Sequence, residues 1–362
     1  MFLAREEEKQ KLDQSIKANK NTFIFSKPYQ GKTSLLKEVV TTLDANKYLF
    51  VYIDCKHTFT TKRFLETCTE TIIKALTVSV KDITTVSQKY LPQLSPNINI
   101  IPGKGMQITM NYSITPKILS QFIKDFFLAL ENISKDTKKQ VIIAFDDFQE
   151  LYNIDKAAII KLIKETINNK YTYIFSCADE NLVSKIFNAK DNLLFKIETM
   201  IYLNKLPLNV IYFFINQELQ KHNLKTTEQV IDKMISICRG EIYFSELLVE
   251  ATIIYGQIHH RISLMDLPKI IKQLLRNQNK LYQMIFASCS THQKNLLLAI
   301  VKNDGKQVYK SSFIFENDLG SAPSVQTSVA ALISKSILAK EDNVHILIDP
   351  FFEQWIRINY LQ

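Results

Sequence analysis

Residues 23–36, FIFSKPYQGKTSLL, join an apolar run to a polar loop and then to a helical pattern. A loop between a strand and a helix can turn its backbone N–H groups inward, and the helix N-terminus adds partial positive charge, so such a segment suits phosphate groups. Lys32 would reach the β- and γ-phosphates of a nucleotide, and the Thr33 hydroxyl would be a ligand of Mg²⁺. The predicted phosphate loop consists of Ser26, Lys27, Pro28, Tyr29, Gln30, Gly31, Lys32, Thr33 and Ser34.

Ser26 departs from the pattern G-x-x-x-x-G-K-[ST], which begins with glycine. Serine is the smallest polar substitute and would keep the loop geometry at a modest backbone cost. The alternative is a chance Gly-Lys-Thr at the start of a helix. The strand pattern before the loop and the helix pattern after it favour the phosphate loop.

Two acidic residues, Asp146 and Asp147, end the apolar run in VIIAFDDFQEL (141–151). A carboxylate at the carboxyl end of a strand beside a phosphate loop can hold Mg²⁺ through water, and the next acid can orient or deprotonate the attacking water. We assign the first role to Asp146 and the second to Asp147. Adjacent acids at a strand end also cap following helices, which is the alternative; the upstream phosphate loop favours the metal site.

Ser176 ends the run YTYIFSC (171–177), which is expected to form a neighbouring strand. Its hydroxyl would contact the γ-phosphate or the attacking water, or would cap the helix that follows, and the sequence leaves both alternatives open. The chain contains no Asn-Lys-x-Asp run of the kind that reads guanine. ATP, bound with Mg²⁺, is therefore the predicted nucleotide.

The elements that must position these residues alternate between strands and helices from residue 22 to about residue 203. Short, nearly continuous apolar runs are typical of parallel strands buried on both faces. These runs lie at 22–26, 48–54, 141–146, 171–177 and 199–203. Helical patterns lie at 32–43, 60–76, 115–133, 155–168 and 180–187. This rhythm predicts an α/β layer architecture around a parallel sheet.

Residues 95–116 interrupt this alternation. Two alternating runs flank a Pro-Gly-Lys-Gly turn signal at 102–105, which predicts an inserted β-hairpin at about 95–114. A helix then restarts, with Thr115 as its N-cap and Pro116 at its first position.

After residue 204 the strand signal gives way to helices. Four helical patterns, at 207–222, 226–238, 242–257 and 266–284, predict a small helical domain. Three further helices, at 291–302, 311–317 and 323–336, precede an alternating stretch at 337–349, the order of a winged helix-turn-helix. The predicted domains are 1–204, 205–284 and 285–362.

The composition sets the broad class. A length of 362 residues suits two or three domains, and 46% hydrophobic with 22% charged residues excludes disordered and fibrous classes. Five scattered cysteines without a Cys-x-x-Cys pair argue against a disulfide framework and a zinc site. The sequence shows neither a signal peptide nor a run of about 18 apolar residues, so we expect a cytoplasmic protein without membrane contact.

The N-terminal FLAREEEKQKL resembles the Phe-x-Gly-Arg-Glu lead-in of the archaeal-type ATPases, a branch of the STAND and AAA+ P-loop NTPases related to origin recognition initiators. The resemblance also covers the phosphate loop, the hairpin, the acidic strand and ILIDPFFEQWIR (346–357), and so spans nearly the whole chain. It implies a P-loop α/β domain, a helical lid and a winged helix. It also places Arg5, at the family's Arg-Glu, among the nucleotide-binding residues.

Two positions depart from that family. The family's arginine ahead of the last strand is Lys196 here, and lysine lacks the bidentate fork that stabilises a γ-phosphate. The lid's Gly-x-Pro element appears as Gly240-Glu241-Ile242, without proline. The neighbouring Arg239 would either read nucleotide from the lid or lie on the surface near a helix end.

The charge points to an anionic partner. The chain carries a net charge of +9, and residues 251–300 hold six basic side chains against one acidic side chain. Lys269, Lys272, Arg276 and Lys280 share one helical face, which would either contact phosphates or simply be a solvated face. The expected recognition helix offers Ser324, Gln326, Thr327 and Ser328 but no arginine, so specific base reading is poorly supported.

These observations predict an ATP-binding switch that hydrolyses ATP slowly and controls a winged-helix module. Its partner through residues 267–362 would be nonspecific DNA or a protein, and a nucleotide-dependent oligomer fits the same class. The alternative is a pseudo-ATPase scaffold with little or no hydrolysis, which Ser26 and Lys196 both suggest.

Overall fold

The computed structural model describes residues 5–56, 58, 60–76, 80–92, 97–101, 105–109, 115–154, 170–179, 182–183 and 197–361. Its chain divides into two compact units, Met1–Asn204 and Lys205–Gln362.

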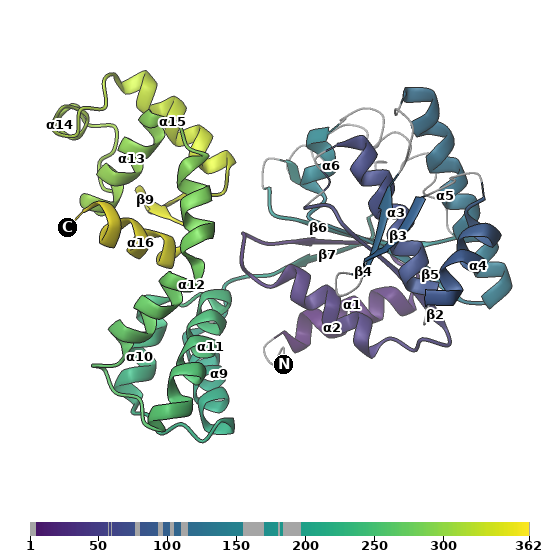
Figure 1. Cartoon of the computed structure of the whole chain (residues 1–362), viewed down its shortest axis with the longest axis horizontal. Helices are drawn as coiled ribbons and strands as arrows, with labels where there is room; N and C mark the ends of the chain where they lie inside the picture. The colour runs from purple at the N-terminus through teal and green to yellow at the C-terminus, as the bar shows by residue number, and fades with distance from the viewer. Residues whose placement is uncertain are drawn as a thin grey trace. The chain divides into compact units, whose positions relative to one another are not determined.

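The first unit is built on a five-stranded parallel sheet with strand order β2-β5-β6-β1-β7 (Figure 1). The strands are β1 (Thr22–Phe25), β2 (Tyr48–Asp54), β5 (Gln140–Asp146), β6 (Thr172–Cys177) and β7 (Thr199–Tyr202). All five lie where the sequence places strands, because each combines β-branched or aromatic residues with burial on both faces. The expected α/β P-loop fold class is confirmed.

Helices cover both faces of this sheet (Figure 1). One face packs against α1 (Glu6–Lys17) and α2 (Lys32–Thr42), and its core includes Leu12, Ile24 and Leu35. The other face packs against α3 (Thr61–Leu76) and α5 (Pro116–Thr137), with α4 (Val80–Tyr90) beside them. The sequence patterns did not predict α1 or α4. The expected helix at 155–168 lies outside the described residues, as does most of the one at 180–187.

The inserted hairpin is present, with β3 (Asn97–Ile101) antiparallel to β4 (Gly105–Thr109). It packs against α3, where Ile108 is fully buried. The restart of α5 follows the expected capping, because the Thr115 hydroxyl accepts a hydrogen bond from the Ile118 N–H at 3.3 Å and Pro116 is the first helical residue.

The second unit contains four helices and then a winged-helix arrangement. The four are α9 (Leu208–Lys221), α10 (Glu228–Ile237), α11 (Ile242–His259) and α12 (Leu267–Ala287). The arrangement that follows is α13 (Thr291–Lys302), α14 (Ser311–Glu316), α15 (Ala322–Ser334), β8 (Leu338–Glu341), β9 (Val344–Leu347) and α16 (Pro350–Tyr360). Helix α12 packs on both α11 and α16 and continues through residue 284 without a break. The domain boundary predicted between residues 284 and 285 stays a prediction.

Buried side chains hold the winged-helix region together. The His292 ring connects α13 to α15 and to the loop before α15: Nδ1 lies 2.7 Å from Ser328 Oγ, and Nε2 lies 2.9 Å from the Leu319 carbonyl. Trp355 is 3% exposed, and its indole N–H donates to Asn279 Oδ1 of α12 at 2.8 Å. No helix among the described residues is long and apolar enough to cross a membrane.

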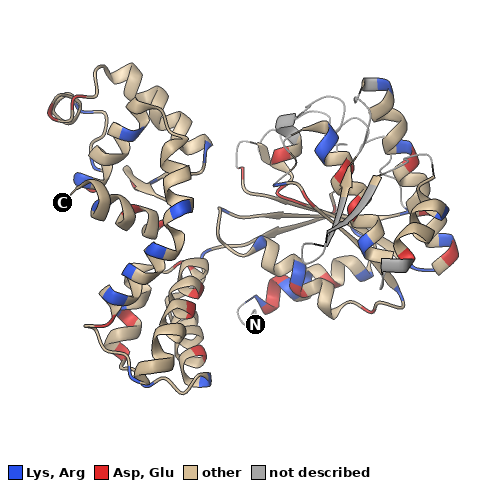
Figure 2. Ribbon diagram, in the orientation of Figure 1, with Lys and Arg blue, Asp and Glu red and all other residues tan. Residues whose placement is uncertain are grey.

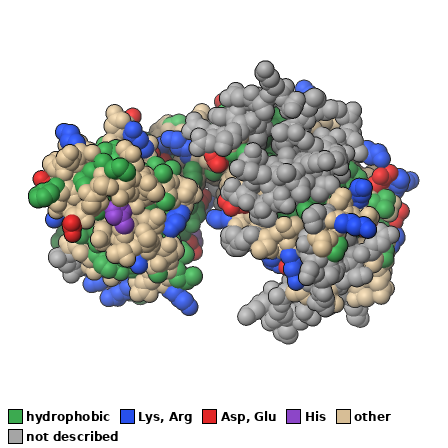
Figure 3. Space-filling model, turned by 90° about the horizontal axis from the view of Figure 1, so that it is seen from above, with side chains coloured by type: hydrophobic (Ala, Val, Ile, Leu, Met, Phe, Trp, Pro, Cys, Tyr) green, Lys and Arg blue, Asp and Glu red, His purple; other side chains and the backbone are tan. Residues whose placement is uncertain are grey.

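Charge is unevenly distributed over this unit. Basic residues recur along α12, whereas acidic residues lie on the neighbouring helices of the bundle (Figure 2). Seen from above, the winged-helix end shows mainly apolar and uncharged surface, with charged side chains spaced around it (Figure 3).

Candidate active site

The carboxyl ends of β1, β5 and β6 meet at one edge of the sheet. Strand β6 lies between the other two, with Ile24 of β1 opposite Ser176 and Phe145 of β5 opposite Phe175. In parallel sheets, loops at this edge form the ligand-binding crevice. The phosphate loop after β1, the acidic pair at the end of β5 and Ser176 near the end of β6 therefore come together.

The phosphate loop leads into a helix whose N-terminal amides are not capped by the protein. Gly31, the N-cap of α2, has a left-handed φ of 88°, and Tyr29 also lies in the left-handed region at 66°. No described side chain caps α2, and its first turn holds no acidic residue. Free amides and the helix dipole make this end a site for an anion.

Lys32 places a buried positive charge inside the loop. Its side chain is 6% exposed, and Nζ donates to the Ser26 carbonyl at 3.2 Å, to Ser26 Oγ at 3.0 Å and to the Lys27 carbonyl at 3.3 Å. Burial lowers the pKa of Lys32, and the charges of Asp147 and Asp146 oppose that shift in part. Among the described residues, the hydrogen-bond partners of this ammonium are neutral oxygen atoms, which a phosphate can replace.

Ser26 replaces the first glycine of the pattern without backbone strain. Its φ lies outside the left-handed region, so this position does not require glycine. Its hydroxyl donates to the Lys27 carbonyl at 2.8 Å and accepts a hydrogen bond from Lys32. The serine therefore takes part in holding the loop lysine.

Asp146 accepts hydrogen bonds from three hydroxyl groups. Thr33 Oγ1 and the Tyr52 hydroxyl each donate to Oδ2 at 2.6 Å, and Ser176 Oγ donates to Oδ1. A threonine hydroxyl beside a carboxylate is a set of hard oxygen ligands, which Mg²⁺ prefers. The predicted pair Thr33 and Asp146 thus fits Mg²⁺ bound together with phosphate oxygens.

Asp147 is held by its neighbours. Its backbone is left-handed, with φ of 52°, and its N–H donates to Ser176 Oγ at 2.9 Å. The side chain of Gln149 donates to Asp147 Oδ1 at 3.1 Å, and Gln149 Oε1 accepts from the Ala178 N–H at 3.1 Å. Gln149 therefore fixes the carboxylate that was assigned to the attacking water.

Ser176 uses its hydroxyl within this network. It donates its proton to Asp146 and accepts from the Asp147 N–H, whereas the carboxylate of Asp179 accepts from the Leu182 N–H of the following segment. The N–H of Leu182 in the following segment is thus bound by Asp179, whereas both hydrogen bonds of the Ser176 hydroxyl go to Asp146 and Asp147. Contact of Ser176 with a γ-phosphate stays a prediction.

Arg5 is buried and holds the backbone of the phosphate loop through a hydrogen bond. The guanidinium is 3% exposed, and Nη2 donates to the Gln30 carbonyl at 3.0 Å and to the Asn204 carbonyl at 2.6 Å. Nη1 pairs with Glu8 at 3.0 Å. These contacts fix the loop backbone; direct contact of Arg5 with nucleotide stays a prediction.

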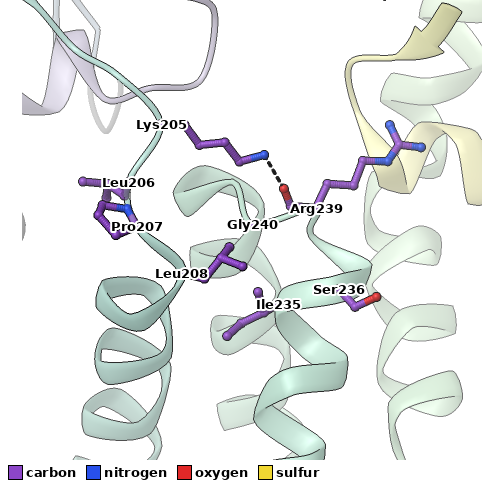
Figure 4. A pocket seen from close by; sticks show the side chains of 8 residues that line it. All are labelled: Lys205, Leu206, Pro207, Leu208, Ile235, Ser236, Arg239 and Gly240. Atoms are coloured by element: carbon purple, nitrogen blue, oxygen red, sulfur yellow. Dashed lines mark hydrogen bonds between the residues drawn. The ribbon is translucent and has the colours of Figure 1, made fainter. Parts of the chain in front are cut away.

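The second unit has a separate pocket of about 500 Å³ beside Gly240 (Figure 4). Leu206, Pro207, Leu208 and Ile235 supply its apolar wall. Figure 4 shows the Arg239 side chain pointing away from Lys205, whose ammonium donates to the Arg239 carbonyl at 2.5 Å. The guanidinium instead donates to the Leu347 carbonyl at 2.5 Å and pairs with Glu353. Neither sequence interpretation of Arg239 foresaw this tie to the winged helix.

Sequence reasoning missed Tyr52 and Gln149. Tyr52 lies on β2, and only the pairing of β2 with β5 brings it to Asp146. A possible signal was its polar hydroxyl two residues before the carboxyl end of a predicted strand. Lys196 lies outside the described residues.

The described residues offer no other metal site. They contain no group of three or more His, Cys, Asp or Glu side chains that could hold a metal ion. All five cysteines are free and buried, and burial raises the pKa of the Cys177 thiol to about 12.

Comparison with known proteins was made for sequence and for structure. The family "Probable winged helix domain" matches residues 280–358. No curated protein matches the chain in sequence. Among solved structures, the Walker-type ATPase PABY2304 of Pyrococcus abyssi is 16% identical with a TM-score of 0.65, over 98% of this chain and 95% of that one.

Two proteins of Aeropyrum pernix, ORC1 and ORC2, are also similar in structure. ORC1, solved in complex with DNA, is 12% identical with a TM-score of 0.61, over 99% of this chain and 93% of that one. ORC2, solved in ADPNP-ADP complexes, is 11% identical with a TM-score of 0.57, over 98% and 91%. The chain shares the fold of archaeal Walker-type and Orc-type ATPases. The resemblance inferred from the sequence is thereby confirmed at the level of the fold.

Proposed function

We propose that this chain is an ATP-binding switch that hydrolyses ATP slowly. The observation that carries the proposal is the N-terminus of α2, which no described side chain caps and which has the buried Lys32 ammonium beside it. Next to it, Thr33 Oγ1 lies 2.6 Å from Asp146 Oδ2. Together these supply amides, a cation and hard oxygen ligands for a Mg²⁺-bound triphosphate. The ADPNP and ADP held by ORC2 of A. pernix support the choice of adenine nucleotide.

In this proposal, different residues bind the phosphates, hold Mg²⁺ and accept the proton from water. The amides of α2 and Lys32 bind and orient the phosphates, while Thr33 and Asp146 hold Mg²⁺, which neutralises phosphate charge when it is bound. Asp147 accepts a proton from the attacking water once its carboxylate is released from Gln149. Tyr52 orients Asp146, and Arg5 holds the loop backbone.

Slow turnover follows from how the site is held. The single proton of the Ser176 hydroxyl is donated to Asp146, and one oxygen of Asp147 is engaged by Gln149. Both groups must rearrange before they can act on a γ-phosphate or a water. A γ-phosphate arginine, which the family's pattern has where Lys196 stands, is worth about 10³ to 10⁵ in rate. We expect turnover below about 1 s⁻¹ without a partner.

Nucleotide binding is tested by thermal unfolding and calorimetry with Mg-ATP. A ligand that binds only the folded state stabilises it by about 2.7 kcal/mol at 100 times Kd, so the melting temperature should rise by several degrees. Lys32→Ala should abolish this rise. Lys37→Ala is the matched control, since Lys37 is an exposed lysine on the same helix. An unchanged melting temperature at saturating Mg-ATP would sink the proposal.

Hydrolysis is tested separately with Asp147→Asn. Asparagine tolerates the left-handed backbone at this position but cannot take the proton. Turnover should fall by about 10² to 10⁴ while ATP affinity stays unchanged. Equal turnover in both proteins would remove Asp147 from the reaction.

A second candidate function is a nucleotide-dependent scaffold without hydrolysis. The bonds of Asp147 to Gln149 and of Ser176 to Asp146 favour it, because they describe a closed catalytic network. A melting-temperature rise with Mg-ATP and no measurable phosphate release, with or without duplex DNA, would select the scaffold.

The proposed partners act through residues 267–362, as either DNA or a protein. We propose a three-part organisation for the switch, with an ATPase domain at 1–204, a lid at 205–284 and a winged helix at 285–362. Turnover that rises with duplex DNA and vanishes in Lys32→Ala would identify DNA as the regulating partner. A nucleotide-dependent oligomer is tested by sedimentation with and without Mg-ATP.

A further inference from the structure

We propose that the exposed basic face of α12 contacts the phosphate backbone of duplex DNA, in place of the recognition helix α15. The α12 stripe is defined by Lys269, Lys272, Arg276 and Lys280. This inference goes beyond the ATP switch and does not depend on it, because the stripe lies in the second unit and uses none of the nucleotide-binding residues.

The stripe carries uncompensated charge. Helix α12 contains four basic and no acidic residues over its 21 positions, and Figure 2 shows the basic residues at intervals along its ribbon. Lys269 lies 3.5 Å from Asp266, whereas Lys272, Arg276 and Lys280 are exposed and form no ion pair within the described part of the chain. Exposed lysines and arginines on other helices of the chain commonly pair, as Lys17 does with Asp13.

The geometry of the stripe suits a regular array of phosphates. Residues four apart on a helix are separated by about 6 Å along its axis, so Lys272 to Lys280 spans about 12 Å. Duplex DNA carries one charge per about 1.7 Å of its axis, so several phosphates lie within that reach. The helix is fixed for this contact, because its opposite face is buried through Ile270, Ile271 and Leu274.

The neighbours of the stripe favour nucleic acid over a lipid surface. Gln273 and Asn277 are exposed beside it, and their amides can donate to phosphate oxygens. A helix that lies in a membrane interface needs a free apolar face next to its basic face. In α12 the apolar face between residues 267 and 275 is covered by the protein.

The winged helix itself lacks the charge for this task. The exposed positions of α15 are occupied by Ala322, Pro323, Ser324, Gln326, Thr327, Ala330, Ile333 and Ser334, none of them basic. The turn between β8 and β9 presents Glu341 and Asp342. Residues 290–361 hold seven basic and seven acidic side chains, so this region has no net charge.

The test measures binding of the full chain to a fluorescent 30-base-pair duplex between 50 and 200 mM salt, without nucleotide. The test variant carries Lys272→Gln, Arg276→Gln and Lys280→Gln together. The control variant carries Lys302→Gln, Lys306→Gln and Lys310→Gln, which removes three exposed lysines of the winged-helix region. Unfolding curves verify that both variants fold.

The α12 variant should lose at least tenfold in affinity, and its slope of log affinity against log salt should flatten by about 3, since each phosphate contact contributes about 0.9. The control should keep the slope of the parent protein. Equal losses in the two variants, or no binding by the parent at 50 mM salt, would overturn the proposal. Binding to vesicles with anionic lipid, but not to DNA, would also overturn it. Lys32→Ala should bind DNA like the parent, which separates this outcome from failure of the ATP switch.

Discussion

At the scale of single residues, Asp146 stands out because its hydroxyl partners come from three different elements. Thr33 belongs to α2, Tyr52 to β2 and Ser176 to β6. In the proposed Mg²⁺ site Thr33 would be a metal ligand, and Tyr52 and Ser176 would then orient the carboxylate. Such supporting bonds to a metal ligand are worth tenfold to a hundredfold in metal affinity.

Tyr52→Phe tests this support with little change in shape. We expect the Mg²⁺ concentration needed for half-maximal ATP binding to rise by about tenfold to a hundredfold. Tyr48→Phe is the control, because Tyr48 lies on the same strand and packs against the same core. If the two variants require the same Mg²⁺ concentration, Tyr52 has only a packing role.

Lys32 gives the site a pH dependence whose sign is set by its lowered pKa. Without ligand, the unfolded chain holds this proton more tightly than the folded chain, so Lys32 makes stability rise with pH between the folded and unfolded pKa values. Bound phosphates favour the ammonium, so nucleotide raises the pKa again. ATP binding should therefore take up a proton, and its affinity should fall as the pH rises toward about 10, the ordinary lysine range.

The measurement is calorimetry of Mg-ATP binding across that range in buffers with different ionisation enthalpies. Proton uptake should grow with pH in the parent protein and in Lys37→Ala. Constant affinity up to the ordinary lysine range would show that the nucleotide does not reach Lys32.

At the scale of elements, the loop at 26–34 keeps its hydrogen bonds to Lys32 although serine replaces the first glycine of the pattern. Because Ser26 needs no left-handed backbone and its hydroxyl holds Lys32, restoring the motif with Ser26→Gly should bring no gain. We expect a loss of about 0.5 to 1 kcal/mol in unfolding free energy, from the greater freedom of glycine in the unfolded chain. ATP affinity should stay the same or fall. Tighter binding or faster turnover in Ser26→Gly would show that the serine obstructs the loop.

The sequence was sufficient for the elements whose signal is local. Strand β5 was recognised from a continuous apolar run, the hairpin from its turn residues, and α5 from Thr115 and Pro116 at its start. Lys32, Thr33 and Asp146 could be named because a loop and a strand end are local patterns; the structure brings Thr33 and Asp146 within hydrogen-bond distance, and their role toward nucleotide stays a prediction. Tyr52 and Gln149 were missed because their roles arise only from pairing between strands and from a turn with a positive φ at Asp147. The predicted helix at 266–284 covers α12 except for its last residues, up to Ala287.

At the scale of the whole molecule, Arg239 connects the start of the second unit to its end. Lys205, the first residue of that unit, donates to the Arg239 carbonyl and pairs with Glu241 at 3.0 Å. The Arg239 guanidinium donates to the Leu347 carbonyl of β9 and pairs with Glu353 of α16. The contacts of Arg239 are one route by which a displacement near Lys205 would reach the winged helix, beside the packing of α12 on α16 and of Phe244 on Phe351.

Arg239→Gln should break this connection. The loss of hydrogen bonds from a charged group costs about 1.5 to 3 kcal/mol, and hydrogen exchange should quicken both at 205–241 and at 344–353. Arg357→Gln is the matched control, because Arg357 also pairs with Glu353 but its other partner is Asp304, within the winged-helix region. That control should quicken exchange only after residue 300. If both variants give the same exchange pattern, Arg239 stabilises the winged helix without coupling it to the junction, and the switch must act through another route.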